Sequence, residues 1–156
     1  MKPFKNILFP LDFSECSEKV FPFALDMAQK FDARLNFLFV ARDISYLTTI
    51  AVSRDRLLNT VAEIARAGEE RMEAFCDREL SDFPNYECKV VTGNPAEKIV
   101  EFASEKGIDM IVMGTHGRKG LDRTLMGSVA DYVIRNANVP VVTVNPFRAK
   151  VKYVRS

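Results

Sequence analysis

The chain has 156 residues and a formal net charge of +1, with 47% hydrophobic and 28% charged residues. This composition is typical of one soluble globular domain, and the small net charge favours neither nucleic acid nor an anionic membrane as a partner. No apolar run approaches the roughly 18 residues that span a bilayer, no signal peptide is recognised, and three sparse cysteines without a C-x-x-C pair argue against a disulfide framework and for a reducing cytoplasm.

Apolar runs and helical periodicities alternate along the chain, bounded by proline, glycine and capping residues. This alternation predicts parallel strands with helices on both faces of the sheet, and therefore an α/β fold of three layers. In chain order, the predicted elements are a strand at residues 5–11, a helix at 14–31, a strand at 34–40, a helix at 54–80, a strand at 86–91, a helix at 94–107, a strand at 108–113, a helix at 129–137 and a strand at 140–145.

Three segments fit this pattern less well. Pro22 lies within the first predicted helix, where it removes a helical hydrogen bond, so we expect a kink or irregular first turns there. Residues 42–53 contain apolar side chains without clear periodicity and fit either a loop or a short helix. Residues 147–156 form a basic C-terminal tail that fits either an added strand or a disordered end.

The segment from Gly114 to Ser128 joins the fourth predicted strand to the last helix and is rich in glycine and cations. Free amides at a helix start attract anions, and glycine lets the backbone approach a ligand closely. The segment is not a Walker loop, because neither Gly114 nor Gly117 has a Gly-Lys-Ser/Thr at the required offset, and G-x-G-x-x-G occurs nowhere in the chain. Its pattern is Gly-x2-Gly-x9-Gly-Ser, filled by Gly114, Gly117, Gly127 and Ser128.

This pattern resembles the ATP-binding signature of the universal stress protein family. Other stretches are also similar to that family: the opening run 5–14 with its Pro-x-Asp, the Gly-Asn-Pro at 93–95, the run 109–117 and the closing run 139–144. The resemblance covers roughly residues 3–146. It implies an open five-stranded parallel sheet of order 3-2-1-4-5, Rossmann-like and of the adenine nucleotide alpha hydrolase kind, in a single domain at residues 1–146.

The implied strand order makes the first and fourth strands neighbours, so Asp12 and Gly114 would face one crevice beyond the carboxyl ends of the strands. Asp12 would accept hydrogen bonds from ribose hydroxyls or help to order a divalent ion near phosphate. The alternative is that Asp12 or Ser14 only caps the first helix, since Asp-Phe-Ser-Glu fits a capping box. By the resemblance, Val40 would offer backbone groups to adenine; alternatively it is a plain core residue.

The expected phosphate cradle consists of three glycines, the Ser128 hydroxyl and the Val129 amide, and the alternative is a glycine-rich surface loop capped by Ser128. Arg118 is expected near the phosphates, although loop cations are commonly only solvated. Thr115 fits a ribose contact or a turn, and Met113 fits the base pocket or the core. The full expected binding set is Pro10, Leu11, Asp12, Val40, Met113, Gly114, Thr115, Gly117, Arg118, Gly127, Ser128 and Val129.

His116 is the only histidine, but the sequence places no second group at catalytic spacing, so no catalytic residue is assigned. The expected cofactor is ATP, with Mg or Mn bound through its phosphates. Asp12 is the one candidate metal ligand, acting through nucleotide-bound Mg. No zinc site is expected from a single histidine and scattered cysteines.

The resemblance implies a dimeric, nucleotide-responsive stress and signalling protein in the cytoplasm, without strong catalytic activity. Its expected partners are an adenine nucleotide, an unidentified protein and a second copy paired through the edge strand at 140–144; neither nucleic acid nor a membrane is expected. Two alternatives stay open. The same fold could act by dimerisation and partner contacts without a nucleotide, or the chain could be a slow ATPase.

Overall fold

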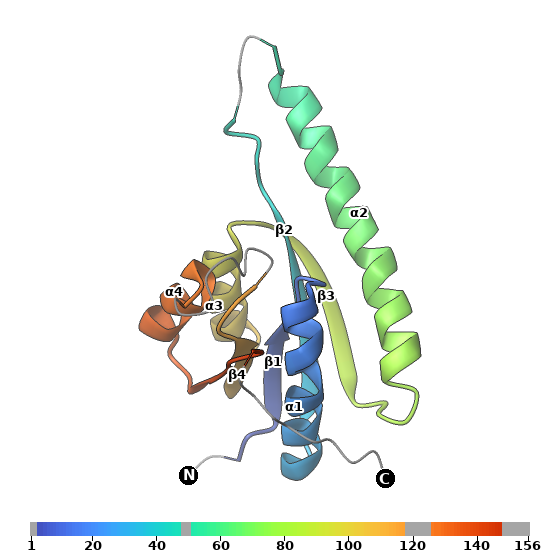
Figure 1. Cartoon of the computed structure of the whole chain (residues 1–156), viewed down its shortest axis with the longest axis vertical. Helices are drawn as coiled ribbons and strands as arrows, with labels where there is room; N and C mark the ends of the chain where they lie inside the picture. Colours follow the sequence, from blue (N-terminus) through green and yellow to red (C-terminus); the bar gives the residue numbers. More distant parts are fainter. Residues whose placement is uncertain (1–2, 48–50, 118–125, 148–156) are drawn as a thin grey trace.

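The computed structural model describes residues 3–47, 51–117 and 126–147, and its strands and helices alternate from β1 to β5 (Figure 1). The expected elements are all present, with ends that shift by a few residues. Their bounds are β1 Asn6–Pro10, α1 Glu15–Phe31, β2 Arg34–Arg42, α2 Arg54–Glu79, β3 Tyr86–Gly93, α3 Pro95–Glu105, β4 Met110–Gly114, α4 Ser128–Asn136 and β5 Val141–Val144.

The five strands form one sheet in the order β3-β2-β1-β4-β5, and every neighbouring pair is parallel. The predicted order 3-2-1-4-5 is therefore confirmed. The side on which the chain adds strands changes at β1: β2 and β3 lie on one side of β1, whereas β4 and β5 lie on the other. Such a switch leaves a crevice beyond the carboxyl ends of the two central strands, which is where open α/β sheets bind ligands.

Each face of the sheet has its own apolar core, so the molecule has three layers. In β1, Ile7 and Phe9 face the cluster that includes residues of α1 and α2, whereas Leu8 faces the cluster formed with α3 and α4. The first face is rich in aromatic rings; for example, the Phe21 and Phe75 ring centroids are 4.9 Å apart. Burial on both faces explains why these strands read as continuous apolar runs.

α1 begins with a side-chain cap, since the Ser14 hydroxyl accepts a hydrogen bond from the Ser17 amide at 3.2 Å. The helix then runs from Glu15 to Phe31 without a break, so the expected irregularity of its first turns at Pro22 is not found. Buried side chains on both sides of the proline, including Val20 and Ala24, pack this helix against the sheet. Tertiary packing therefore holds the helix despite the missing amide donor.

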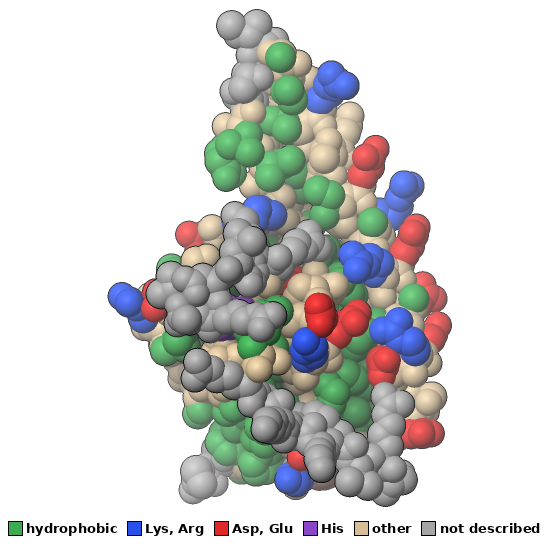
Figure 2. Space-filling model, viewed as in Figure 1, with side chains coloured by type: hydrophobic (Ala, Val, Ile, Leu, Met, Phe, Trp, Pro, Cys, Tyr) green, Lys and Arg blue, Asp and Glu red, His purple; other side chains and the backbone are tan. Residues whose placement is uncertain are grey.

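The ambiguous stretch 42–53 contains no helix in the parts that the structure describes: Arg42 ends β2, a turn follows, and Ser53 caps α2. The 26 residues of α2 span about 39 Å, so its N-terminal part projects beyond the sheet (Figure 1). Hydrophobic side chains gather on this projecting part (Figure 2). Four exposed large apolar residues lie in the loop after β2 and in the first half of α2: Tyr46, Leu47, Leu58 and Ile64.

Within the described ranges, no helix combines the length and hydropathy that a membrane span requires. Of the predicted tail at 147–156, only Phe147 belongs to these ranges, so the remaining tail lies outside the description.

Candidate functional site

A cavity of about 520 Å³ opens beyond the carboxyl ends of β1, β2 and β4, at the topological switch point between β1 and β4. The structure brings eleven of the twelve expected binding residues to the wall of this cavity. The twelfth, Arg118, lies outside the described residues, as do the cations at 119 and 123. The eleven are Pro10, Leu11, Asp12, Val40, Met113, Gly114, Thr115, Gly117, Gly127, Ser128 and Val129.

Asp12 connects the end of β1 to the glycine-rich segment. Its Oδ1 atom accepts a hydrogen bond from the Ser14 amide at 2.9 Å, and its Oδ2 atom lies beside Gly117. Ser14, not Asp12, is the N-cap of α1, so the alternative in which Asp12 itself caps the helix is wrong. Between them, Phe13 has φ of 59°, a left-handed conformation that is unusual for an aromatic residue. Strained residues of this kind cluster at functional sites.

The two ends of the glycine-rich segment are fixed by the main chain. The Thr115 amide donates to the Val144 carbonyl of β5 at 3.0 Å, and the Gly127 amide donates to the Thr115 carbonyl at 2.7 Å. A Cβ atom on Gly127 would lie 3.1 Å from that same carbonyl oxygen. Glycine at this position therefore lets the start of α4 sit close to the end of β4.

Backbone amides at the N-terminus of α4 lie at this cavity. Gly127 is the N-cap and offers no side-chain cap, and the first intrahelical bond runs from the Asp131 amide to the Gly127 carbonyl. The three preceding amides, at Ser128, Val129 and Ala130, have no acceptor among the residues that the structure describes. Ser128 is the first helical residue, so the alternative in which its side chain caps the helix is wrong.

Sequence reasoning missed several residues that line the cavity. The Ser17 hydroxyl is buried, with no hydrogen-bond partner found in the described parts of the chain. Arg42, at the end of β2, is the one arginine or lysine among the described lining residues. Its position could have been found from the rule that ligands bind at strand carboxyl ends. The apolar lining from Ile44, Ile64 and Pro95 carried no comparable sequence signal.

His116 also lines the cavity, but it is buried and engaged by its neighbours. Its Nδ1 atom lies 2.8 Å from the Thr115 hydroxyl, and its ring meets the edge of Phe147 with centroids 5.2 Å apart. These contacts give His116 a place in the packing between the glycine-rich segment and the end of β5.

Metal ligands do not gather at this site or elsewhere in the described ranges, where no group of three or more His, Cys, Asp or Glu side chains is arranged to hold an ion. Asp12, the single residue that the sequence suggests as a metal contact, lines the cavity.

Comparison with known proteins identifies relatives along almost the whole chain. The universal stress protein family model matches residues 3–145. Universal stress protein MJ0531 from Methanocaldococcus jannaschii is 34% identical over 142 residues, which cover 90% of this chain and 82% of the relative. Universal stress protein MJ0577 from the same organism is 32% identical over 162 aligned positions, covering 90% of this chain and 94% of the relative.

Solved structures agree with the fold. Universal stress protein UspA from Lactobacillus plantarum has a TM-score of 0.80 at 27% identity, covering 92% of this chain and 99% of that one. The structure of MJ0577 has a TM-score of 0.74 at 30% identity, covering 92% and 96%. Two universal stress proteins that share the fold at 20% and 22% identity were solved in complex with cAMP and with dAMP. By the family match and the curated relatives, this chain belongs to the universal stress protein family.

Proposed function

We propose that this chain binds ATP in the cavity at the end of β4 and acts as a nucleotide-responsive module. One observation carries the proposal: the unpaired amides at the start of α4 open onto the same cavity as Asp12 and the glycine-rich segment. An anionic phosphate would accept hydrogen bonds from these amides and would be favoured by the dipole of the helix. The two relatives in complex with cAMP and dAMP add support for an adenine nucleotide.

The rest of the lining suits a nucleoside. Met113, Ile44 and Ile64 contribute apolar surface against which an adenine ring could pack. Val40, near the end of β2, would offer main-chain groups to the base, while Asp12 would accept hydrogen bonds from ribose hydroxyls. Arg42 would add positive charge at the rim. The ligand thus finds an apolar wall for its base and donors for its phosphates in one cavity.

Mg or Mn would arrive with the nucleotide. In the described ranges the protein offers no cage of three or more metal-binding side chains, so the phosphates would supply most of the oxygen ligands. Asp12 would contact such an ion or its waters. In this proposal the site binds the nucleotide without strong catalytic activity. A slow ATPase is the competing possibility, and phosphate release lost in Asp12→Ala would support it.

We further propose that two copies pair through β5 and that the pair works in the cytoplasm, where an unidentified protein partner reads the nucleotide state. β5 is an edge strand whose four residues are only half-buried, which is typical of an edge that pairs with another chain. In this proposal residues 1–146 act as one domain.

Calorimetric titration with ATP and magnesium tests the proposal. Two substitutions at position 128 distinguish the contribution of the Ser128 hydroxyl from that of the Ser128 amide. Ser128→Ala removes only the hydroxyl and should weaken binding by roughly fivefold. Ser128→Pro removes the amide as well and should weaken binding by roughly tenfold or more. The helix should survive, because proline is favoured at the first helical position and Gly127, with ψ of 148°, already has the conformation that precedes proline.

Undetectable binding of ATP to the unsubstituted chain at millimolar nucleotide would refute the proposal. Native mass spectrometry of freshly purified protein distinguishes the remaining alternative. A co-purified adenine nucleotide supports the ATP-binding function, whereas a bare dimer that also fails to bind ATP supports action by dimerisation and partner contacts alone.

A further inference from the structure

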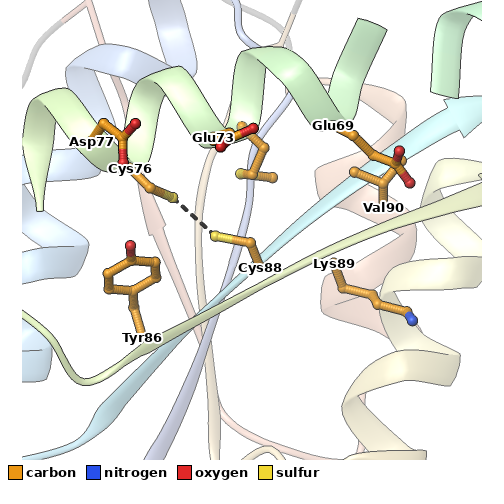
Figure 3. Close-up of a pocket in the computed structure, with 9 residues that line it drawn as sticks. Glu69, Glu73, Cys76, Asp77, Tyr86, Cys88, Lys89 and Val90 are labelled. Carbon is orange, nitrogen blue, oxygen red and sulfur yellow. Dashed lines mark hydrogen bonds between the residues drawn. The ribbon is translucent and has the colours of Figure 1, made fainter. Parts of the chain in front are cut away.

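Two free cysteines meet on the side of the sheet that α2 covers. The Sγ atoms of Cys76, near the end of α2, and Cys88, in the edge strand β3, are 2.9 Å apart (Figure 3). The pair is separated by twelve positions in the sequence. The tight turn between Glu79 and Tyr86 folds the end of the helix back over the following strand, and this packing brings the thiols together.

The two thiols line a cavity of about 430 Å³ that is separate from the proposed nucleotide site, since no residue lines both. Cys76 is 4% exposed and Cys88 is half-buried, so a small molecule would approach through this cavity. Figure 3 shows the acidic side chains of Glu69, Glu73 and Asp77 above the strand, with Tyr86 below the thiol pair. Lys89 is the one cation in the lining.

We propose that Cys76 and Cys88 form a reversible disulfide within one chain when hydrogen peroxide or a small neutral hydroperoxide reaches this cavity. The two sulfur atoms need to approach by less than 1 Å to reach the roughly 2.05 Å of a disulfide bond. The neighbouring elements α2 and β3 already hold them in contact, so oxidation requires no large rearrangement of the fold.

The hydrogen bond between the thiols assigns their roles. The hydrogen bond with Cys88 lowers the pKa of Cys76, although burial and the carboxylate of Asp77 act in the opposite direction. The same hydrogen bond, together with burial, raises the pKa of Cys88. In this proposal Cys76 ionises first and attacks the oxidant, and Cys88 keeps its proton until the second step.

Both steps balance. The Cys76 thiolate attacks one peroxide oxygen, the O–O bond breaks, and the departing hydroxide takes the proton released by Cys76 and leaves as water, giving a sulfenic acid. The Cys88 sulfur then attacks the Cys76 sulfur, the S–O bond breaks, and the leaving hydroxide takes the proton of Cys88 as a second water. Both sulfurs are oxidised, and one peroxide is reduced to two waters.

The charges around the pair select the oxidant. Three carboxylates against one lysine give the cavity an acidic lining, which repels anionic reagents. Glutathione disulfide carries several carboxylates and is too large to reach a buried sulfur easily. A neutral peroxide meets neither obstacle, so we expect peroxide to oxidise the pair much faster than glutathione disulfide does.

The test uses the full chain carrying Cys16→Ala, which removes the third thiol and leaves the pair intact. One equivalent of hydrogen peroxide should remove both thiols together, with a loss of two hydrogen atoms by mass spectrometry and a Cys76–Cys88 link in the peptide map. Dithiothreitol should restore both thiols. Because the link closes a short loop, the melting temperature of the oxidised chain should rise by about 5 °C.

Single substitutions check the order of the steps. With Cys88→Ala the sulfenic acid of Cys76 has no resolving thiol, so a cyclic diketone should trap it; with Cys76→Ala, Cys88 should react at least about tenfold more slowly. Three results would overturn the proposal: both thiols persisting in peroxide, a link that forms between chains, or Cys88 oxidising at full rate without Cys76. The far-UV circular dichroism spectrum of the oxidised chain checks independently that the fold is retained.

Discussion

The Oδ2 atom of Asp12 lies 2.8 Å from the position that a Cβ atom on Gly117 would occupy. The carboxylate at the end of β1 and the backbone that follows β4 are thus in direct contact across the mouth of the proposed nucleotide site. The same carboxylate accepts the Ser14 amide, so it has little freedom to move aside. A Cβ atom at position 117 would therefore have to displace the Asp12 carboxylate.

Gly117→Ala should therefore weaken ATP binding by displacing the Asp12 carboxylate. We expect a loss of affinity of roughly tenfold, with a loss of stability of about 1 kcal/mol. Calorimetric titration and urea unfolding measure the two effects. In an Asp12→Ala background the same glycine substitution meets no carboxylate, so its added effect on affinity should largely vanish. Equal effects in both backgrounds would show that Gly117 acts without Asp12.

Ser17→Ala should separate binding from stability. The buried Ser17 hydroxyl has no hydrogen-bond partner in the described part of the chain, so its removal should leave the free energy of unfolding unchanged or raise it by up to about 1 kcal/mol. If a bound nucleotide supplies the missing partner, ATP affinity should fall by roughly fivefold. Ser14→Ala, which removes the N-cap of α1, should instead cost about 1 kcal/mol of stability. A destabilised Ser17→Ala chain with full ATP affinity would contradict this role.

Thr143→Pro should weaken the proposed dimer without unfolding the sheet. The carbonyls of Pro140 and Val144 accept bonds from the β4 side, so the alternate residues Val141 and Thr143 turn their peptide groups to the open edge. Proline at 143 removes an outward amide, and the dissociation constant of the dimer should rise by roughly tenfold or more. Sedimentation measures it, with Thr143→Val as the control that keeps the amide.

Gly68→Ala should destabilise the chain although alanine favours helices. A Cβ at this buried position of α2 would lie 2.4 Å from the Cδ1 and Cε1 atoms of Phe39. The gain in helix propensity is about 1 kcal/mol, whereas overpacking costs about 1–3 kcal/mol, so we expect a net loss of about 1–2 kcal/mol in urea unfolding. Phe39→Leu in the same chain should recover part of it. Ala67→Gly, the reverse change at the neighbouring exposed position, measures how much the difference in helix propensity alone contributes to the free energy of unfolding.

Alternation of apolar runs with helical stripes was sufficient to predict the layers of this fold. The strand order came from the family resemblance, because one sequence does not determine which strands pair. The residues of the expected binding set that belong to local motifs, such as Gly114 and Gly117, do line one cavity. Ser17 and Ile64 were missed because they reach the cavity through the packing of α1 and α2, and no local pattern marks that packing.

The cap assignments show how local patterns mislead. Asp12 fits a capping box by spacing, but Ser14, the other candidate cap in the sequence, is the N-cap of α1. Ser128 likewise has the side chain of an N-cap, yet Gly127 takes that position, where a Cβ atom would lie 3.1 Å from the Thr115 carbonyl oxygen. In the same way, the spacing of Cys76 and Cys88 gave no sign of their contact, which depends on how α2 folds back over β3.

The uneven burial of α2 has a consequence for how this helix opens. Its buried residues, from Val61 to Cys76, are concentrated toward its C-terminal part, and the turns before them project past the sheet. Those first turns are held mainly by the Ser53 cap and by their own hydrogen bonds, which alone give marginal stability. The helix should therefore fray from Arg54 inward while its C-terminal part stays folded. The two ends of one continuous helix would then differ in local stability and in amide hydrogen exchange.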